Sequence, residues 1–274
     1  MRRLAITLGL LLSLTMFVSA AAPPDDAVAG NTPTLLKATN PPGCNTSEMA
    51  LCDVIADATR ASGGTELAII NGGDVIHNLD GGETTWGDIR FLFSEDRALG
   101  VTEITGAELL ELLEHGVSHA TVDMSTETLD LEASAFDGFP QISGFSFSYD
   151  PSAPEGLRIV SMELDGGKNI TSDMTLRLTA PIFMLEGGYG YPALEYQPMD
   201  VTLSEAMGRY YGGETLPEFR TGRITCIGMS DRFSFSRPMI FFVAIAAILI
   251  SLSVRGFLQK HGGDHDIPDD FDCE

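Results

Sequence analysis

Residues 51–73 decide the fold, and they read Leu-Cys-Asp-Val-Ile-Ala-Asp-Ala-Thr-Arg-Ala-Ser-Gly-Gly-Thr-Glu-Leu-Ala-Ile-Ile-Asn-Gly-Gly. The first half has apolar residues at helical spacing on one side and charged residues on the other: Leu51, Val54, Ile55 and Ala58 against Asp53, Asp57 and Arg60. Gly63-Gly64 ends this predicted helix, and Glu66–Ile70 is a short apolar run typical of a buried strand. The stretch therefore predicts a helix followed at once by a buried strand.

Helix and strand signals continue to alternate downstream. The run Thr105-Gly-Ala-Glu108 matches a capping box, in which the Thr hydroxyl accepts from a free helical N–H and the Glu side chain reaches back. We therefore expect a helix from this run through Leu113. Phe145, Phe147 and Tyr149 alternate with serines, which is the pattern of a half-buried strand.

A glycine-rich turn separates two further strand signals. Arg158–Leu164 and Thr175–Thr179 lie on either side of Asp165-Gly-Gly167, and we expect them to pair as a hairpin. Helices interleaved with both alternating and continuous strands favour an α/β domain built on a mixed sheet.

Two apolar runs near the ends of the chain predict its topology. Residues 1–22 combine Arg2 and Arg3 with an apolar run and small residues, the pattern of a cleavable signal peptide, although an uncleaved anchor is the alternative. Residues 238–254 are uncharged and apolar on every face, near the short end of the ~17–25 residues that cross a bilayer core. A buried core helix is the alternative there. We expect a single-pass type I membrane protein of the secretory pathway, with its ectodomain extracellular or lumenal.

These signals divide the chain into six segments. They are a signal peptide (1–22), a lead-in segment (23–43), one folded domain (44–214), a stalk (215–237), a single transmembrane helix (238–254) and a cytosolic tail (255–274). The folded part has the ordinary size of one domain.

The net charge of the chain disfavours some classes of binding partner. Acidic residues number 39 against 16 basic ones, and the formal net charge is −23. A surface of this sign repels nucleic-acid backbones and anionic lipid headgroups, so we expect no nucleic-acid polymer as a partner. A small anionic ligand would need a local group of arginines. Sequence does not identify a protein partner.

Cysteines and sequons fit an oxidising compartment. Cys44, Cys52 and Cys226 precede the apolar run and allow one disulfide plus one thiol, or an intermolecular bond. Three pairings are open, and a bridge between Cys44 and Cys226 would close the two ends of the domain. Asn45-Thr-Ser47 and Asn169-Ile-Thr171 are N-glycosylation sequons, so Asn45 and Asn169 are candidate glycan sites.

Three collinear runs resemble the C-terminal domain of 5′-nucleotidases, the substrate-binding half of those enzymes. The runs are Val54–Arg60 with Leu67–Gly73, Gly82–Ile89 with Thr102–Leu109, and Gly138–Gly144 with Phe183–Tyr191. The resemblance implies that the α/β domain holds a nucleotide, with arginines gripping its phosphate or ribose and two aromatic rings enclosing its base. Guanidinium groups pair bidentately with phosphate oxygens, and a stacked base is worth roughly 1–3 kcal/mol.

Several positions keep the family pattern. Phe183 falls at one of the two base-stacking rings, in the pattern Phe-x-x-x-Gly-Gly-x-Gly. Asn71, Gly72 and Gly73 keep the start of the substrate loop, where glycines allow the backbone to approach a ligand closely. Gly138 matches a loop glycine that lines the same pocket. The resemblance thus makes these five residues candidates for ligand binding.

Other positions depart from the pattern. The family run Asn-Gly-Gly-Gly-Ile-Arg is replaced by Asn71-Gly-Gly-Asp-Val-Ile76, and Asn45 stands where an arginine is frequent. Glu95 replaces the second stacking ring, Arg97 replaces an asparagine, and Tyr189 replaces the aspartate of Gly-Gly-Asp-Gly. Most positions that grip anions or enclose the base have therefore changed type.

Two readings of these departures are open. In the first, Arg97 replaces the missing arginines, and Tyr189 or Phe93 replaces the missing ring. In the second, Arg97 and Glu95 form a solvated loop pair. Because the family arginines are absent, any retained ligand is expected to be neutral, such as a nucleoside. Arg97 and Tyr189 complete the list of candidate binding residues.

Catalysis in the resembled enzymes belongs to a separate domain that binds two metals. No such ligand set precedes the first matched helix, so we expect no catalytic residues, metal site or cofactor in this chain itself. Gly263-Asp-His-Asp266 is similar to a Gly-Asn-His-Asp/Glu metal motif but lies in the predicted tail without companion ligands. We expect a non-catalytic nucleoside-binding or interaction module. The alternatives are 5′-nucleotidase activity through a missing or partner-supplied metal domain, and a purely structural interaction domain.

Overall fold

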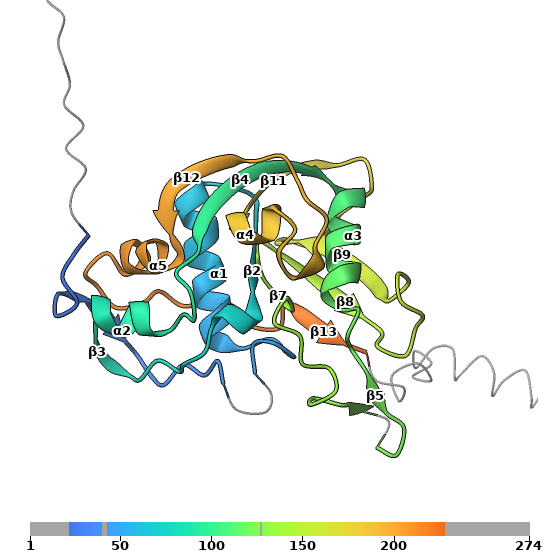
Figure 1. The fold of residues 1–274 in the computed structure, drawn as a ribbon, viewed down its shortest axis with the longest axis horizontal. Coiled ribbons are helices and arrows are strands. Elements are labelled where there is room, and N and C mark those ends of the chain that lie inside the picture. Colours follow the sequence, from blue (N-terminus) through green and yellow to red (C-terminus); the bar gives the residue numbers. More distant parts are fainter. Residues whose placement is uncertain (1–21, 40–42, 127, 228–274) are drawn as a thin grey trace, which may run out of the picture.

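The computed structural model describes residues 22–39, 43–126 and 128–227 (Figure 1). Its strands are β1 (Val28–Thr32), β2 (Leu67–Asn71), β3 (Gly82–Thr85), β4 (Ala98–Thr105), β5 (Val122–Asp123), β6 (Thr128–Leu129), β7 (Pro140–Ser143), β8 (Phe145–Tyr149), β9 (Ile159–Leu164), β10 (Lys168–Asn169), β11 (Thr175–Pro181), β12 (Gln197–Thr202) and β13 (Ile224–Cys226). Its α-helices are α1 (Ala50–Gly63), α2 (Trp86–Phe91), α3 (Gly106–Gly116), α4 (Ile182–Leu185) and α5 (Leu203–Tyr211).

A five-stranded mixed sheet forms the centre of the fold, with strand order β12-β4-β11-β2-β7. Strand β11 runs parallel to β2, while the pairs β12–β4, β4–β11 and β2–β7 are antiparallel. Figure 1 shows β12, β4 and β11 side by side across the molecule. The predicted α/β class with a mixed sheet is therefore confirmed.

Strand β2 lies between two hydrophobic cores. All five of its residues are buried, and Leu67 and Ile69 belong to one core while Ile70 belongs to the other. Because successive side chains of a strand point to opposite faces, both faces of the sheet are covered at this strand. This double burial explains why Leu67–Ile70 is a continuous apolar run.

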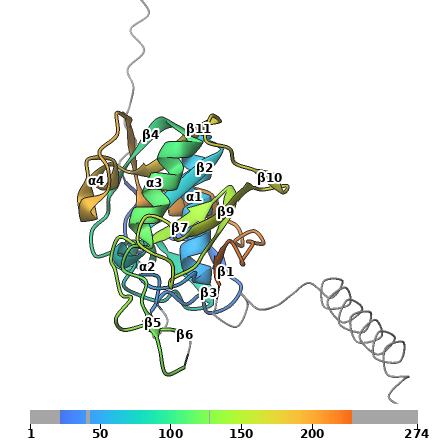
Figure 2. The ribbon, with the colours of Figure 1, turned by 90° about the vertical axis from the view of Figure 1, so that its right-hand side faces the viewer.

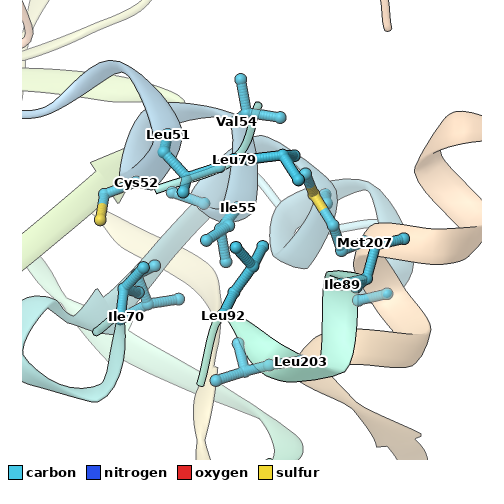
Figure 3. Packing of buried hydrophobic residues seen from close by; sticks show 14 of the residues in the cluster. Leu51, Cys52, Val54, Ile55, Ile70, Leu79, Ile89, Leu92, Leu203 and Met207 are labelled. Atoms are coloured by element: carbon cyan, nitrogen blue, oxygen red, sulfur yellow. The ribbon is translucent and has the colours of Figure 1, made fainter. Parts of the chain in front are cut away.

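Helix α1 covers one face of the sheet with its apolar side. Leu51, Val54 and Ile55 pack against Ile89 and Leu92 of the α2 region and against Leu203 and Met207 of α5, as Figure 3 shows. The other core brings α3 and α4 together with β8. The predicted helix at residues 51–63 and the strand after it are both confirmed, and Gly64 ends the helix in the left-handed conformation.

The polar side of α1 differs from our prediction. Asp53 is 0% exposed and Asp57 is 9% exposed, although both were placed on the charged face opposite the apolar stripe. Arg223 approaches them from the C-terminal part of the chain, with Nη2 2.8 Å from Asp57 Oδ2 and Nε 3.8 Å from Asp53 Oδ1. A buried partner distant in sequence thus turns the charged face of the helix into an interior.

Three helices begin with the same reciprocal cap. Thr85, Thr105 and Thr202 each accept a hydrogen bond from the third helical N–H, while the acidic side chain there reaches back to the Thr backbone. The capping box at Thr105 was predicted, and α3 extends to Gly116, three residues beyond the expected end. Such reciprocal caps satisfy N–H groups that a helix leaves open at its start.

A second sheet has the order β10-β9-β8-β13. Phe145, Phe147 and Tyr149 of β8 are buried and alternate with half-exposed serines, as predicted. The predicted pairing of Arg158–Leu164 with Thr175–Thr179 is wrong. The turn at residues 165–167 returns the chain to the short strand β10, and β11 pairs instead with β4 and β2 in the central sheet.

The folded unit is wider than the predicted domain of residues 44–214. Within the expected lead-in segment, β1 pairs with β3, and Gly30 packs against Tyr211 and the backbone of Glu214. Within the expected stalk, β13 extends the second sheet parallel to β8. The strands β1 and β13, one in each of these segments, are therefore part of the domain. The β5–β6 hairpin projects from its body in Figures 1 and 2.

One of the three open cysteine pairings is present. Cys44 and Cys52 form a disulfide that closes a loop of the chain just before and within α1. Cys226 takes no part in it and lies in β13, so the bridge between the two ends of the domain does not form. The order of the strands, rather than a covalent link, joins those ends.

The predicted signal peptide (1–22), transmembrane helix (238–254) and cytosolic tail (255–274) lie almost entirely outside the described residues. None of the helices in the described part of the chain combines the length and apolar composition needed to cross a bilayer.

Candidate functional site

Several strand ends meet at one edge of the central sheet and build the candidate site. The parallel strands β2 and β11 both end there, and β4, antiparallel to β11, begins there. Asn71 therefore ends β2 and Gly72-Gly73 follows it, Phe183 follows β11, and Arg97 directly precedes β4. Ligands of α/β sheets commonly bind beyond the carboxyl ends of strands. Topology alone thus gathers residues that are far apart in the sequence.

A pocket of about 620 Å³ opens beside the predicted substrate loop. Gly72 and Gly73 form one wall, and Asn45 and Ile76, the two positions where the family carries arginines, form others. A side chain at residue 72 would come within 1.8 Å of the Cys44 carbonyl oxygen, so only glycine lets the disulfide-bonded segment approach this closely.

The lining of this pocket is largely apolar, and its charged groups are acidic. The apolar side chains come from Ala38, Val75, Ile76, Leu131 and Ala135, and the carboxylates from Glu132 and Asp137. Among the described residues that line it, none is a lysine, arginine or histidine. A phosphate entering this pocket would meet carboxylates without a cation to balance them.

Asp74 is the centre of a buried polar cluster next to the pocket. It stands where the family has its third loop glycine, and it is 0% exposed. Its Oδ1 accepts from the Tyr189 hydroxyl at 3.0 Å and from Arg97 Nη2 at 3.5 Å. Its Oδ2 accepts from Asn71 Nδ2 at 3.4 Å. Three positions that depart from the family pattern, residues 74, 97 and 189, therefore contact one another.

Arg97 lies on the aromatic ring of Phe183. The guanidinium carbon is 3.9 Å from the ring centroid, a cation–π arrangement, and Nη1 donates to Glu95 at 2.5 Å. Burial opposes the charge, but Asp74 and then Glu95 raise the pKa of Arg97 above its ordinary value, so it stays cationic. The pairing of Arg97 with Glu95 is thus present, but Arg97 is not a solvated loop residue, since only 17% of its side chain is exposed. Whether Arg97 replaces the family's arginines stays a prediction.

Tyr189 has an unusual backbone for its type. Its φ is 55°, the left-handed region that a bulky residue adopts at a cost of roughly 1–2 kcal/mol. The hydrogen bond to Asp74 compensates, and burial followed by the Asp74 charge raises the pKa of the Tyr189 hydroxyl to about 12. His115 Nε2 also hydrogen-bonds the Tyr189 carbonyl oxygen at 2.9 Å. The strained residue is therefore held from two sides.

The remaining predicted residues border the same cluster. Tyr189 and Phe183 meet edge to face with centroids 5.0 Å apart. Gly138 fits between Phe136 and Tyr189, because a Cβ there would come within 2.5 Å of the Phe136 ring and 3.0 Å of Tyr189. Its carbonyl accepts from the buried Tyr191 hydroxyl at 2.6 Å. Of the seven predicted binding positions, Gly72 and Gly73 line the pocket. The other five, residues 71, 97, 138, 183 and 189, form the cluster around Asp74 beside it.

Asp74 itself was not among the predicted binding residues. The sequence carried one signal for it, a carboxylate in place of a loop glycine. Phe93, considered as a replacement ring, is 7% exposed and belongs to the core with α1. Among the described residues, no group of three or more His, Cys, Asp or Glu side chains is arranged to hold a metal ion.

The two sequons differ in their surroundings. Asn169 is exposed on the short edge strand β10, whereas Asn45 is half-buried and lines the pocket. A glycan on Asn45 would therefore extend from the wall of the candidate site, while one on Asn169 would lie at the edge of the second sheet.

Comparison with known proteins agrees with this geometry. The family model described as the 5′-nucleotidase C-terminal domain matches residues 28–196. The chain belongs to this family. The match begins at β1, which supports including the expected lead-in segment in the domain.

Three of the proteins that this chain matches are much longer than the matched region. The 5′-nucleotidase precursor of Thermus thermophilus superimposes with a TM-score of 0.63 at 24% identity, over 74% of this chain and 40% of that one. The trifunctional nucleotide phosphoesterase YfkN of Bacillus subtilis is 27% identical over 53% of this chain and 10% of its own length. A 5′-nucleotidase of Vibrio vulnificus is 29% identical over 56% of this chain and 24% of its own length. This chain thus spans a quarter or less of those two curated relatives.

Proposed function

We propose that this family member is a non-catalytic ligand-binding module that takes a neutral nucleoside or a similar uncharged aromatic molecule. The single observation that carries the proposal is the pocket beside Gly72 and Gly73, which keeps the family's loop but has Asn45 and Ile76 at the arginine positions. Its loop backbone and apolar wall suit a planar ring, and its acidic side chains disfavour a phosphate.

The neighbouring cation does not restore phosphate binding. Arg97 already pairs with Asp74 and Glu95, so this group of three charges is net negative. A phosphate would have to compete with two carboxylates for one guanidinium. The loss of one charge-assisted hydrogen bond costs about 1.5–3 kcal/mol, which corresponds to roughly 10- to 150-fold in affinity.

The setting of the module is part of the proposal. The apolar runs at residues 1–22 and 238–254 support an ectodomain outside the cytosol on one membrane helix, and the disulfide between Cys44 and Cys52 suits an oxidising compartment. The sequons at Asn45 and Asn169 would then be accessible to glycosylation. A loss of molecular mass on glycosidase treatment would show that they carry glycans.

One observation favours a second function, hydrolysis with a partner domain. The matched relatives include nucleotide phosphoesterases and 5′-nucleotidases that are several times longer than the aligned region. A metal-bearing domain in another chain, or in sequence adjoining this one, would complete such an enzyme. Phosphate release by the purified chain alone is expected to stay at background with Mn²⁺, Zn²⁺ or Co²⁺.

Calorimetry with adenosine and adenosine 5′-monophosphate tests the ligand proposal. The purified full-length chain is expected to bind the nucleoside weakly and the monophosphate more weakly by at least tenfold. Replacing Ile76 with arginine returns a cation to the pocket wall and should raise monophosphate affinity about tenfold while leaving adenosine affinity unchanged.

Leu110→Arg is the matched control, because Leu110 is 38% exposed on α3 and does not line the pocket. Ile76 is similarly exposed at 43%, so both variants add one surface charge of the same kind. Tight monophosphate binding by the unmodified chain, or metal-dependent phosphate release that survives repurification, would contradict the proposal.

A further inference from the structure

The ring of Phe183 is already occupied in this structure. The Arg97 guanidinium lies over one face at 3.9 Å, Tyr189 meets the ring edge to face, and Gly188 lies directly against it. A Cβ at residue 188 would come within 2.4 Å of two Phe183 ring carbons, so glycine is required for that approach. A planar ligand that stacks on Phe183 needs a free face, and Arg97 covers one.

Arg97 is held on the ring by unequal contacts. Glu95 gives the short contact, but the Glu95 side chain is 67% exposed and therefore competes with water. Asp74 is buried, yet its contact with Nη2 is long at 3.5 Å. The buried Nε atom has no hydrogen-bond partner among the described residues. The guanidinium is thus placed over the ring without full use of its five donors.

We propose that Arg97 is an internal occupant of the ligand site and the residue that sets its specificity, because an aromatic ligand reaches the covered face of Phe183 only when Arg97 moves away. The guanidinium is planar and stacks on the ring as a base would, so it competes for the same surface. The exposed Glu95 offers the displaced side chain a carboxylate, whereas the buried Asp74 cannot follow it outward. This inference rests on the proposed function and adds one assumption, that the ligand's ring stacks on Phe183, which does not line the pocket but joins it through Tyr189 and Asp74.

Two features support displacement over a permanent structural role. The substituted positions contact each other, since Asp74, Arg97 and Tyr189 form one hydrogen-bonded group around the ring. The unpaired Nε and the long Asp74 contact leave donors that a ligand acceptor can satisfy once the side chain swings outward. A cation–π contact of this kind is worth an amount comparable to a tenfold change in affinity.

The test compares adenosine binding by the full-length chain with binding by Arg97→Gln and by the double variant Asp74→Asn/Arg97→Gln. Removing the guanidinium should raise adenosine affinity about tenfold or more, and adding Phe183→Ala should abolish the gain. The double variant guards against misfolding, because Arg97→Gln alone leaves the buried Asp74 charge less compensated. Arg209→Gln is the control, as its exposed arginine pairs with Glu205 on α5.

The possible outcomes distinguish a failure of the role proposed for Arg97 from a failure of the proposed nucleoside binding. If the unmodified chain and both variants bind adenosine with the same affinity, and Phe183→Ala weakens that binding, the proposed role of Arg97 is wrong. The proposal of nucleoside binding would then stand. Absence of adenosine binding in every protein would overturn both. A gain in affinity in the double variant that disappears with Phe183→Ala supports both.

Discussion

Arg97 and Arg223 are both paired with aspartates, yet their surroundings differ in kind. Arg223 is 4% exposed, with Nη2 donating to Asp57 at 2.8 Å and Nη1 donating to the Ile142 carbonyl at 2.8 Å and the Asp53 carbonyl at 3.3 Å. Arg97 has one exposed partner, one distant partner and an aromatic face. A guanidinium whose donors are used ties segments together, whereas one with unused donors can exchange partners.

The position of Arg223 in the chain explains its structural role. It directly precedes β13, and its own N–H and that of Ile224 both donate to the Glu48 carboxylate before α1. The side chain then passes between α1 and β7 to reach Asp53, Asp57 and Ile142. One residue therefore joins the C-terminal strand to the first helix and the central sheet.

The largest expected effect comes from removing Arg223. Arg223→Met should lower the free energy of unfolding by about 3–5 kcal/mol, because the buried Asp57 loses its cation and the Ile142 and Asp53 carbonyls lose their donor. Urea denaturation followed by circular dichroism measures it. Arg220→Met is the control, since Arg220 lies in the same segment but is 52% exposed and pairs with the half-exposed Asp165. A loss below about 1 kcal/mol for Arg223→Met would show that the cluster does not hold the C-terminal strand.

The next effect concerns pH, because carboxylates outnumber the cation around Arg223. Burial, and then the charge of Glu48, raises the pKa of Asp53 to about 8, although Arg223 acts in the opposite direction. The unfolded chain loses this proton near 3.8, while the native state keeps it to about 8. Between pH 3.8 and about pH 8 the native protein therefore binds more protons at Asp53 than the unfolded chain does. The contribution of Asp53 to stability is thus fully present below pH 3.8 and is lost as the pH rises to about 8.

Asp53→Asn isolates that contribution. An amide resembles the protonated carboxyl in shape and does not ionise, so the fall in stability between pH 4 and pH 8 should become shallower in this variant. Urea midpoints at several pH values in this range measure the slope. Asp200→Asn on the central sheet's edge strand β12 is the control. Identical slopes for Asp53→Asn and the unmodified chain would mean that Asp53 is ionised in the native protein.

The smallest effect is expected at the cluster around Arg97. Tyr189→Phe removes the hydroxyl that donates to Asp74 but keeps the ring against Phe183 and the left-handed backbone, so unfolding should become easier by only about 1 kcal/mol. Tyr196→Phe is the control, because its hydroxyl bonds to Glu186 at an exposed site. A loss as large as that of Arg223→Met would contradict the distinction drawn between the two clusters.

Local sequence was sufficient for those elements whose signals are local. The apolar spacing of Leu51–Ala58, the glycine that ends α1, the capping box at Thr105 and the alternation in β8 each act within a few residues. The run Asn71–Gly73 and Phe183 were recognised as binding candidates in the same way, by resemblance of short motifs. Helical and strand periodicities report which face is apolar, and here they reported it correctly.

Tertiary structure decided what depends on partners distant in the chain. Asp53 and Asp57 read as surface charges because nothing nearby in sequence reveals Arg223, which is 166 residues away from Asp57. The same reason hid the pairing of β11 with β4 and β2 and the place of β1 and β13 in the sheets. It also hid Asp74, whose role follows from Arg97 and Tyr189 reaching one carboxylate from separate elements. The periodicity of a sequence predicts which face of a helix or strand is apolar, but only the packing of the whole chain determines which residues cover each face.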